Sequence, residues 1–328
     1  MKSVSNNHDF LFLYEAIQSN PNGDPDQENK PRMDYDTQTN LVSDVRLKRY
    51  VRDWLADNGH EIFVSLQDDK NVSMDERLRH FLESIPADND LYNEIFTESD
   101  EFRQQFDKII ETKKAKFTNE LLKDKSDYKP LNLFLLQWFV KKKWIDIRMF
   151  GSAFAVKGFN HAYTGPIQIN WGYSLHPVEL LNNTVSSKMN DDSGTFGKDY
   201  RVHYSLIGFT GTINARAARH TGLGEDDVQL FNDALWSSIP ESPTRSKGNQ
   251  YPLALVDITY AEGHPNGYFR DLRRLIDFKP VDNKAEAEIR RLEDGRLDFS
   301  KLKKALEEAK SKGVITEFKV RTASGIEF

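Results

Sequence analysis

Abrupt changes of pattern near the start of the chain constrain the fold more than any other feature. Residues 10–14 form an apolar run that is typical of a β-strand, and the expected strand extends over residues 9–18. The segment NPNGDP, at residues 20–25, then breaks the chain into a long polar loop. Residues 39–57 have helical spacing, because Leu47 and Val51 fall on one face at about 100° per residue. The chain must therefore place a strand, a polar loop and an amphipathic helix in immediate succession.

The expected helix carries cations on the side opposite to its apolar stripe. Arg46 and Arg49 point away from the stripe, and Arg52 lies at its flank. Thr39 is the expected N-cap, and residues 58–59, Asn-Gly, are the expected stop. A helix that is buried on one side and basic on the other can follow a phosphate backbone. The alternative is a basic face that is only solvated, which is common for charged residues.

Composition limits the classes of function. The chain of 328 residues has a net charge of −6, which argues against bulk electrostatic capture of nucleic acid and requires a local basic groove instead. The absence of cysteine excludes disulfides, thiolate zinc sites and thiol nucleophiles. No apolar run approaches the roughly 20 residues of a membrane span. We therefore expect a soluble cytoplasmic protein without a membrane partner.

Further elements follow in the chain. Residues 60–66 are expected to be a second strand, which would give a β-α-β unit with a parallel pair. Residues 68–143 are rich in charge and in helix formers and predict a helical insertion. Residues 144–156 return to a strand pattern, with small residues at Gly151 and Ser152 where a backbone could approach a ligand closely. Residues 165–175 alternate with period two and predict a strand with one buried side.

Residues 178–199 lose all periodicity and are polar and glycine-containing. A stretch of this length without pattern is usually a functional or a disordered loop. Met189 and Phe196 are its only sizeable apolar residues in the distal part, and such groups could stack on a base. A helix at residues 225–239 and a strand at residues 251–260 come after it.

These elements approach the order β-α-β-β-α-β of a split ferredoxin-like fold, which RNA-recognition modules also use. The predicted fold class is α+β, with a ferredoxin-like or RRM-like core, a helical insertion and a long thumb-like hairpin loop. The expected parts are a core of residues 1–67, 144–177 and 200–280, a helical insertion at 68–143, a thumb loop at 178–199, and a C-terminal helical and strand extension at 281–328.

Other chemistry finds little support in the sequence. The acids of residues 24–36 suggest a Ca²⁺ or Mg²⁺ site, but their spacing and the prolines depart from a calcium loop. The histidines are scattered, and neither a phosphate-binding loop nor a nucleophile elbow occurs. We expect no catalytic residue, no metal and no cofactor.

Several motifs together are specific. They are NPNGDP at 20–25, PRMD at 31–34, LVSDV at 41–45, DIRMFGSA at 146–153, GPIQINW at 165–171 and GTINAR at 211–216. In this order they resemble the backbone subunit of type I CRISPR Cascade complexes, the RAMP family that coats the guide RNA, in its I-B/I-C branch. In that family the DIRMFGSA motif lies at the RNA-binding surface, and the thumb wedges into the neighbouring subunit's RNA path.

The resemblance implies a non-catalytic subunit that binds crRNA and polymerises along it for antiviral DNA interference. Its partners would be crRNA, target DNA through the guide, other copies of itself and other Cascade subunits. The residues expected to contact RNA are Arg32, Arg46, Lys48, Arg49, Arg52, Arg148, Phe150, Ser152, Met189, Arg201, Arg216, Arg219 and His220.

Two alternatives remain open. Related backbone subunits of type III complexes cut target RNA with an aspartate in the loop after the first strand. Asp34 and Asp36 occupy the comparable loop here, so a metal-dependent endoribonuclease is one alternative. The other is a structural protein that binds no nucleic acid, which the acidic net charge permits.

Overall fold

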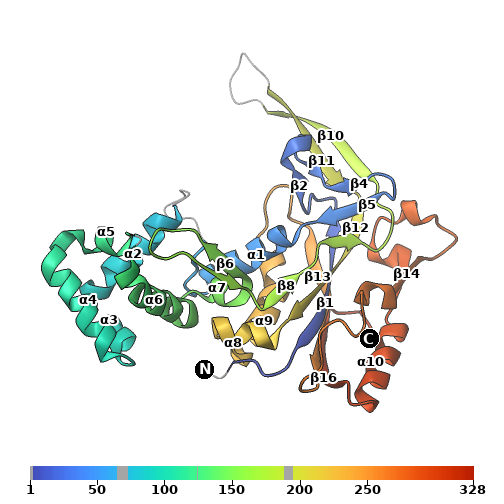
Figure 1. The fold of residues 1–328 in the computed structure, drawn as a ribbon. Coiled ribbons are helices and arrows are strands. Elements are labelled where there is room, and N and C mark those ends of the chain that lie inside the picture. Colours follow the sequence, from blue (N-terminus) through green and yellow to red (C-terminus); the bar gives the residue numbers. More distant parts are fainter. Residues whose placement is uncertain (1–2, 65–72, 124, 188–194) are drawn as a thin grey trace. The chain divides into compact units, whose positions relative to one another are not determined.

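The chain divides into two compact units in a computed structural model that describes residues 3–64, 73–123, 125–187 and 195–328 (Figure 1). The first, here called the helical unit, comprises Met1–Ser3, Leu55–Pro166 and Arg216–Asp227. The second, the sheet unit, comprises Val4–Trp54, Ile167–Ala215 and Val228–Phe328. Among the described residues, no helix has both the length and the apolar character needed to cross a membrane.

The sheet unit is built on an antiparallel sheet with β1 (His8–Ile17) near its middle. β1 pairs with β12 (Tyr204–Ile213) on one side and with β13 (Gln250–Tyr260) on the other. The full order is β16-β13-β1-β12-β9-β5-β4, with β8 also paired to β12. The remaining strands are β16 (Ile315–Thr322), β9 (Gly172–Ser174), β8 (Ile167–Ile169), β5 (Thr39–Val42) and β4 (Met33–Asp34).

Both faces of β1 are covered, which explains why its residues 10–14 are continuously apolar rather than alternating. On one face, Leu11 and Leu13 join a core with residues of α10 (Ser300–Ser311). On the other face, the Phe10 ring meets Phe231 of α9 (Glu225–Glu241) edge-on, with ring centroids 5.4 Å apart. The sheet is therefore the middle layer of this unit.

The helix α1 (Asp44–Asp57) begins later than the sequence predicted. Thr39 is the first residue of β5 and not an N-cap. Ser43 takes that role, because its hydroxyl oxygen accepts a hydrogen bond from the Arg46 backbone N–H at 3.2 Å. The Asn22 side-chain oxygen in turn accepts hydrogen bonds from the Ser43 N–H and hydroxyl, at 2.9 and 3.0 Å. The NPNGDP loop thus fixes the start of α1.

The helical unit has an aromatic-rich core. Phe139 and Trp144 are stacked with ring centroids 5.0 Å apart, and Phe96 and Phe106 lie 5.2 Å apart. Its helices are α2 (Met74–Ala87), α3 (Asn89–Phe96), α4 (Asp100–Lys113), α5 (Phe117–Leu121), α6 (Lys129–Lys142), α7 (Ile145–Phe150) and, apart from its first residue, α8 (Ala215–Thr221). A ribbon of β6 (Gly151–Phe154) and β7 (His161–Thr164) completes it. The helical periodicity of residues 74–142 is therefore confirmed.

The fold class is confirmed as α+β, but the expected parallel pair is wrong. Residues 60–64 are not part of a strand in the described portion of the chain, and β1 is antiparallel to both of its neighbours. The segment around Phe63 instead caps a buried carboxylate, since the backbone N–H groups of Phe63 and Val64 donate to Asp146 at 2.8 and 3.0 Å. An apolar run of three residues was therefore not sufficient evidence for a strand.

Two other strand predictions need correction. Residues 145–150 form α7, so the strand expected over residues 144–156 is reduced to β6. The strand expected over residues 165–175 is interrupted between β8 and β9, and Trp171 at the interruption is 48% exposed rather than buried. The alternation of apolar residues was real, but the break turns Trp171 to solvent.

The segment expected to be a thumb-like hairpin loop contains a hairpin, as predicted. β10 (Leu180–Ser187) and β11 (Thr195–Val202) pair antiparallel along their whole length. Met189 lies outside the described residues. Backbone hydrogen bonds can form a hairpin from polar residues, which is why periodicity did not reveal it. The remaining short elements are β2 (Gly23–Asp24), β3 (Lys30–Pro31), β14 (Asp277–Pro280) and β15 (Gly295–Asp298).

Candidate nucleic-acid interface

Arg46 is the most unusual cation of the sheet unit. Its guanidinium lies over the Tyr50 ring, with Cζ 3.9 Å from the ring centroid. Its Nε is buried and has no hydrogen-bond partner among the described residues. No ion pair joins Arg46 to a carboxylate within that part of the chain either. A half-buried guanidinium in this state lacks the acceptor that such groups normally have.

Lys247, in the loop before β13, is a second cation close to Arg46. Burial, and after it the charge of Arg46, lowers the pKa of Lys247. The residue is half-buried, and no ion pair involves it within the described residues. Two cations that repel each other without a carboxylate between them favour a bound anion. A phosphate between Arg46 and Lys247 would relieve this repulsion.

Other cations of α1 are engaged in ion pairs along the helix. Lys48 Nζ lies 2.9 Å from Asp44 Oδ2, and Arg49 is bidentate on Asp53 with an NH2–Oδ1 distance of 2.7 Å. Both are i,i+4 pairs. The pair at Arg49 is about one-third exposed on each side, and such pairs contribute little to stability. These cations can therefore turn towards a phosphate at small cost. Arg52, on the same helix, is half-buried.

The side chains of Arg32 and Arg201 form hydrogen bonds with groups of the protein itself. Arg32 NH1 donates to Asp24 Oδ2 at 3.2 Å. Arg201 donates to the Asp199 carboxylate at 3.1 Å, to the Gln18 carbonyl at 3.0 Å and to the Arg245 carbonyl at 3.1 Å. Each of its three nitrogens is thus occupied by the protein. The geometry gives Arg201 the role of a clamp at the base of the β10–β11 hairpin.

Arg148 differs from the expectation most clearly. Its side chain is 6% exposed and forms a bidentate ion pair with Asp227, through Nε–Oδ2 at 3.0 Å and NH2–Oδ1 at 2.9 Å. The third nitrogen donates to the Lys141 carbonyl at 3.2 Å. A phosphate ligand needs an accessible guanidinium, and that of Arg148 is not accessible in this structure. Its neighbour Phe150 is buried as well, whereas Ser152 on β6 is half-buried.

The remaining expected residues lie together on α8. Arg216, Arg219 and His220 are all exposed. His220 also lines a cavity of about 360 Å³, together with His161 of β7 and Gln137 of α6. The Tyr163 hydroxyl nearby is buried without a partner among the described residues, and burial raises the pKa of Tyr163 to about 12. This surface therefore gathers cations and neutral hydrogen-bonding groups.

The structure groups the expected residues into two surfaces. One is α1 with Lys247, in the sheet unit, and the other is α8, in the helical unit. Sequence reasoning missed Lys247, although the segment TRSKGN around it does contain two cations in a loop. What marks Lys247 is its position beside Arg46, some 200 residues earlier in the chain, which no local pattern can show.

The acids of the NPNGDP loop have internal uses. Hydrogen bonds from Lys198 and then Tyr200 lower the pKa of Glu28, whose carboxylate lies 3.0 Å from Lys198 Nζ. Asp34 accepts from the Asp36 N–H at 3.1 Å and from the Thr37 hydroxyl at 2.9 Å. In the portion of the chain that the structure describes, no three histidine or acidic side chains lie close enough to hold a metal ion.

Comparison with known proteins identifies the family. Residues 6–300 match the family model described as CRISPR-associated protein Cas7. A protein of Haloferax volcanii with the same description is 27% identical over 316 residues, which cover 92% of this chain and 83% of that protein.

A solved structure agrees in fold. A chain of a "CRISPR RNA-guided surveillance complex, pre-nicking" is 15% identical, covers 79% of each chain and superposes with a TM-score of 0.50. A chain of another "CRISPR RNA-guided surveillance complex" is 12% identical, covers 98% of this chain and 93% of its own, and gives 0.48. Because the family model spans nearly the whole sequence, this chain belongs to the Cas7 family of CRISPR-associated proteins.

Proposed function

We propose that this protein is a crRNA-binding backbone subunit that oligomerises along the guide RNA of a type I Cascade complex, of the I-B/I-C branch, in antiviral DNA interference. The family match over residues 6–300 supports the class of protein. The observation that carries RNA binding is the pair of Arg46 and Lys247, two half-buried cations to which no carboxylate is joined within the described residues.

The proposed mechanism is binding without chemistry. Arg46 and Lys247 hold one phosphate, and Arg49 and Lys48 exchange their helical partners for neighbouring phosphates. Contacts to the backbone leave the base edges of the guide exposed, so that the guide itself pairs with target DNA. Arg216, Arg219 and His220 offer a second cationic surface on α8. Arg148 and Arg201 position α8–α9 and the hairpin instead of binding RNA.

A guide RNA that is longer than one binding surface would be covered by several copies of the subunit. Copies that meet head to tail form an open helical filament along one RNA. In this proposal the subunit's partners are crRNA, further copies of itself, target DNA through the guide and other Cascade subunits, in the cytoplasm. Met189, which lies between β10 and β11 in the sequence, stays the candidate for a wedge between bases.

Salt dependence of RNA binding tests the proposal. Each phosphate contact to single-stranded RNA contributes about 0.7 to the slope of log K against log salt concentration. The variant Arg46→Ala/Lys247→Ala should therefore bind more weakly and lower that slope by about 1.4 in a filter-binding titration. The variant Arg296→Ala/Lys304→Ala removes two exposed cations of the same unit, changes the net charge equally and should leave the slope unchanged. Equal slopes for the wild type and the Arg46/Lys247 variant would contradict the proposed site.

A second candidate, a metal-dependent endoribonuclease acting on target RNA, is favoured by one observation. Asp34 and Asp36 are both exposed in the loop that follows β1. Incubation with complementary RNA and Mg²⁺ separates the two functions. Cutting by the wild type that is lost in Asp34→Ala supports the nuclease, whereas intact RNA under both conditions supports a subunit that only binds.

A further inference from the structure

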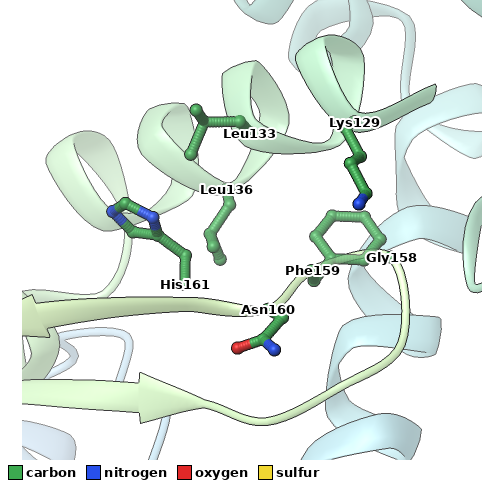
Figure 2. A pocket seen from close by; sticks show the side chains of 7 residues that line it. All are labelled: Lys129, Leu133, Leu136, Gly158, Phe159, Asn160 and His161. Carbon is green, nitrogen blue, oxygen red and sulfur yellow. The ribbon is translucent and has the colours of Figure 1, made fainter. Parts of the chain in front are cut away.

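A cavity of about 330 Å³ lies in the helical unit, between α6 and the loop that leads into β7 (Figure 2). Pockets that enclose a ligand or a side chain commonly have volumes of about 300–1,000 Å³, so this one is large enough for a single aromatic group. Of the residues that line it, His161 also borders the cavity beside His220, and the other six lie outside the RNA-binding surfaces above. Its occupant therefore has to be inferred from its own chemistry.

The floor of the cavity is apolar and its rim is polar. Leu136 and Phe159 are buried at the bottom, and Leu133 is a large apolar side chain left 38% exposed. Figure 2 shows Lys129 and His161 at opposite ends of the cavity. An apolar floor with a lysine and a histidine at the rim fits an aromatic group that is flanked by negative charge.

The walls of the cavity are fixed before anything binds. The Asn132 side-chain N–H groups donate to the carbonyls of Leu121 and Gly158, at 2.8 and 2.9 Å. Gly158 has a φ of +80°, and a Cβ there would lie only 2.4 Å from the Leu121 carbonyl oxygen. The loop is therefore locked onto α6, and an occupant would not have to order it.

The sheet unit carries a group with the complementary chemistry. Tyr35, at the turn between β4 and β5, is 56% exposed. Asp34 and Asp36 on either side of it are exposed, and no ion pair joins Asp36 to a cation in the described residues. The hydrogen bonds from Asp36 and Thr37 to the Asp34 carboxylate hold this turn in shape. Tyr35 is thus a preformed aromatic knob with an acidic surround.

We infer that Tyr35 of one copy inserts into the α6–β7 cavity of the next copy, with Asp34 and Asp36 facing Lys129 and His161 at its rim. This inference rests on the proposed function, which requires head-to-tail contact. A knob and a cavity at different places on one chain make a heterologous contact, which extends instead of closing. Tyrosine in a largely apolar pocket is also among the residues that contribute most to binding at interfaces.

The test uses the full chain with two variants, Tyr35→Ala for the knob and Leu133→Glu for the cavity. Leu133 and Tyr35 are exposed, so neither change removes a core residue. Each variant should bind with wild-type affinity to an RNA that is too short for two copies. On a long RNA, each should need about tenfold more protein to assemble, because a central interface residue is lost. Tyr268→Ala and Val320→Glu, at exposed positions of the sheet unit, are the matched controls and should assemble normally.

Mixing the two variants tests whether the knob of one copy binds the cavity of another. Tyr35→Ala keeps its cavity and Leu133→Glu keeps its knob, so an equal mixture should form pairs but no longer chains, as measured by sedimentation. Either variant assembling like the wild type, or a mixture without pairs, overturns the inference. Loss of affinity for the short RNA in Leu133→Glu alone also overturns it, because the cavity would then hold nucleic acid.

Failure of the proposed function is a separate result. It would appear as a wild type that binds neither the short nor the long RNA. In that case sedimentation of the concentrated variants and of their mixture without RNA still decides whether the knob and the cavity meet.

Discussion

At the scale of single residues, the same side chain serves opposite purposes in Arg46 and Arg148. Arg46 stacks on Tyr50 with a buried Nε that has no acceptor in the described chain, whereas all three nitrogens of Arg148 have acceptors. Both arginines stand beside apolar residues in the sequence, so local pattern does not separate them. The difference lies in whether a carboxylate, here Asp227, is brought to the guanidinium by folding.

The structural role of Arg148 gives the first prediction. Arg148→Met leaves the buried Asp227 carboxylate without its cation, which should lower the free energy of unfolding by about 3–5 kcal/mol in urea denaturation. The double variant Arg148→Met/Asp227→Leu removes both charges and should recover a large part of that loss. A single variant with normal stability and weakened RNA binding would instead return Arg148 to the set of phosphate ligands.

At the scale of elements, the β6–β7 ribbon shows why small residues occur in the DIRMFGSA and GPIQINW motifs. The sequence suggested that backbone near Gly151 could approach a ligand. The structure shows an approach to the chain itself, because a Cβ on Gly165 would lie 2.0 Å from the Phe150 carbonyl carbon. Gly151 has a φ of +74°, and a Cβ there would lie 2.2 Å from the Tyr163 carbonyl oxygen. The two glycines therefore close the ribbon where it leaves α7.

This close packing gives the second prediction. In Gly165→Ala the added methyl group meets backbone atoms that cannot rotate away, so the ribbon has to open. We expect the free energy of unfolding to fall by more than about 2 kcal/mol, measured by chemical denaturation. Gly248→Ala is the matched control, because its Cβ would have only one neighbour within contact range, at 3.6 Å, and it should change stability little. Equal stability of the two variants would show that the ribbon tolerates side chains at this point.

At the scale of the whole molecule, the acidic net charge and the proposed binding of a polyanion are compatible. The charge of −6 is spread over the chain, and many cations are consumed by internal pairs such as Arg273 with Asp271. What matters for a phosphate is the local excess at Arg46 and Lys247. The two compact units have separate hydrophobic cores, one around Phe106 and Trp144 and one around the sheet.

Separate cores give the third prediction. Phe106→Ala removes a fully buried ring from the helical unit and should cost about 3–5 kcal/mol of local stability. Hydrogen exchange followed by mass spectrometry should then show faster exchange in α2–α6, with amides of β1, β12 and β13 unchanged. Leu302→Ala, in the core of the sheet unit, should produce the reverse pattern. Faster exchange of the same amides in both variants would mean that the chain unfolds as one cooperative unit.

The sequence alone determined the first strand, the helix α1, the helical character of residues 74–142 and the resemblance to the family. These follow from propensities and spacings that act within a few turns of chain. It could not determine the direction of the strands, the burial of Arg148 or the residues that surround Arg46. Asp227 lies 79 residues from Arg148, and β1 meets β12 about 200 residues later and β13 about 240 residues later. Such partners are chosen by tertiary packing, because burial and ion pairing depend on which distant segments the fold brings together.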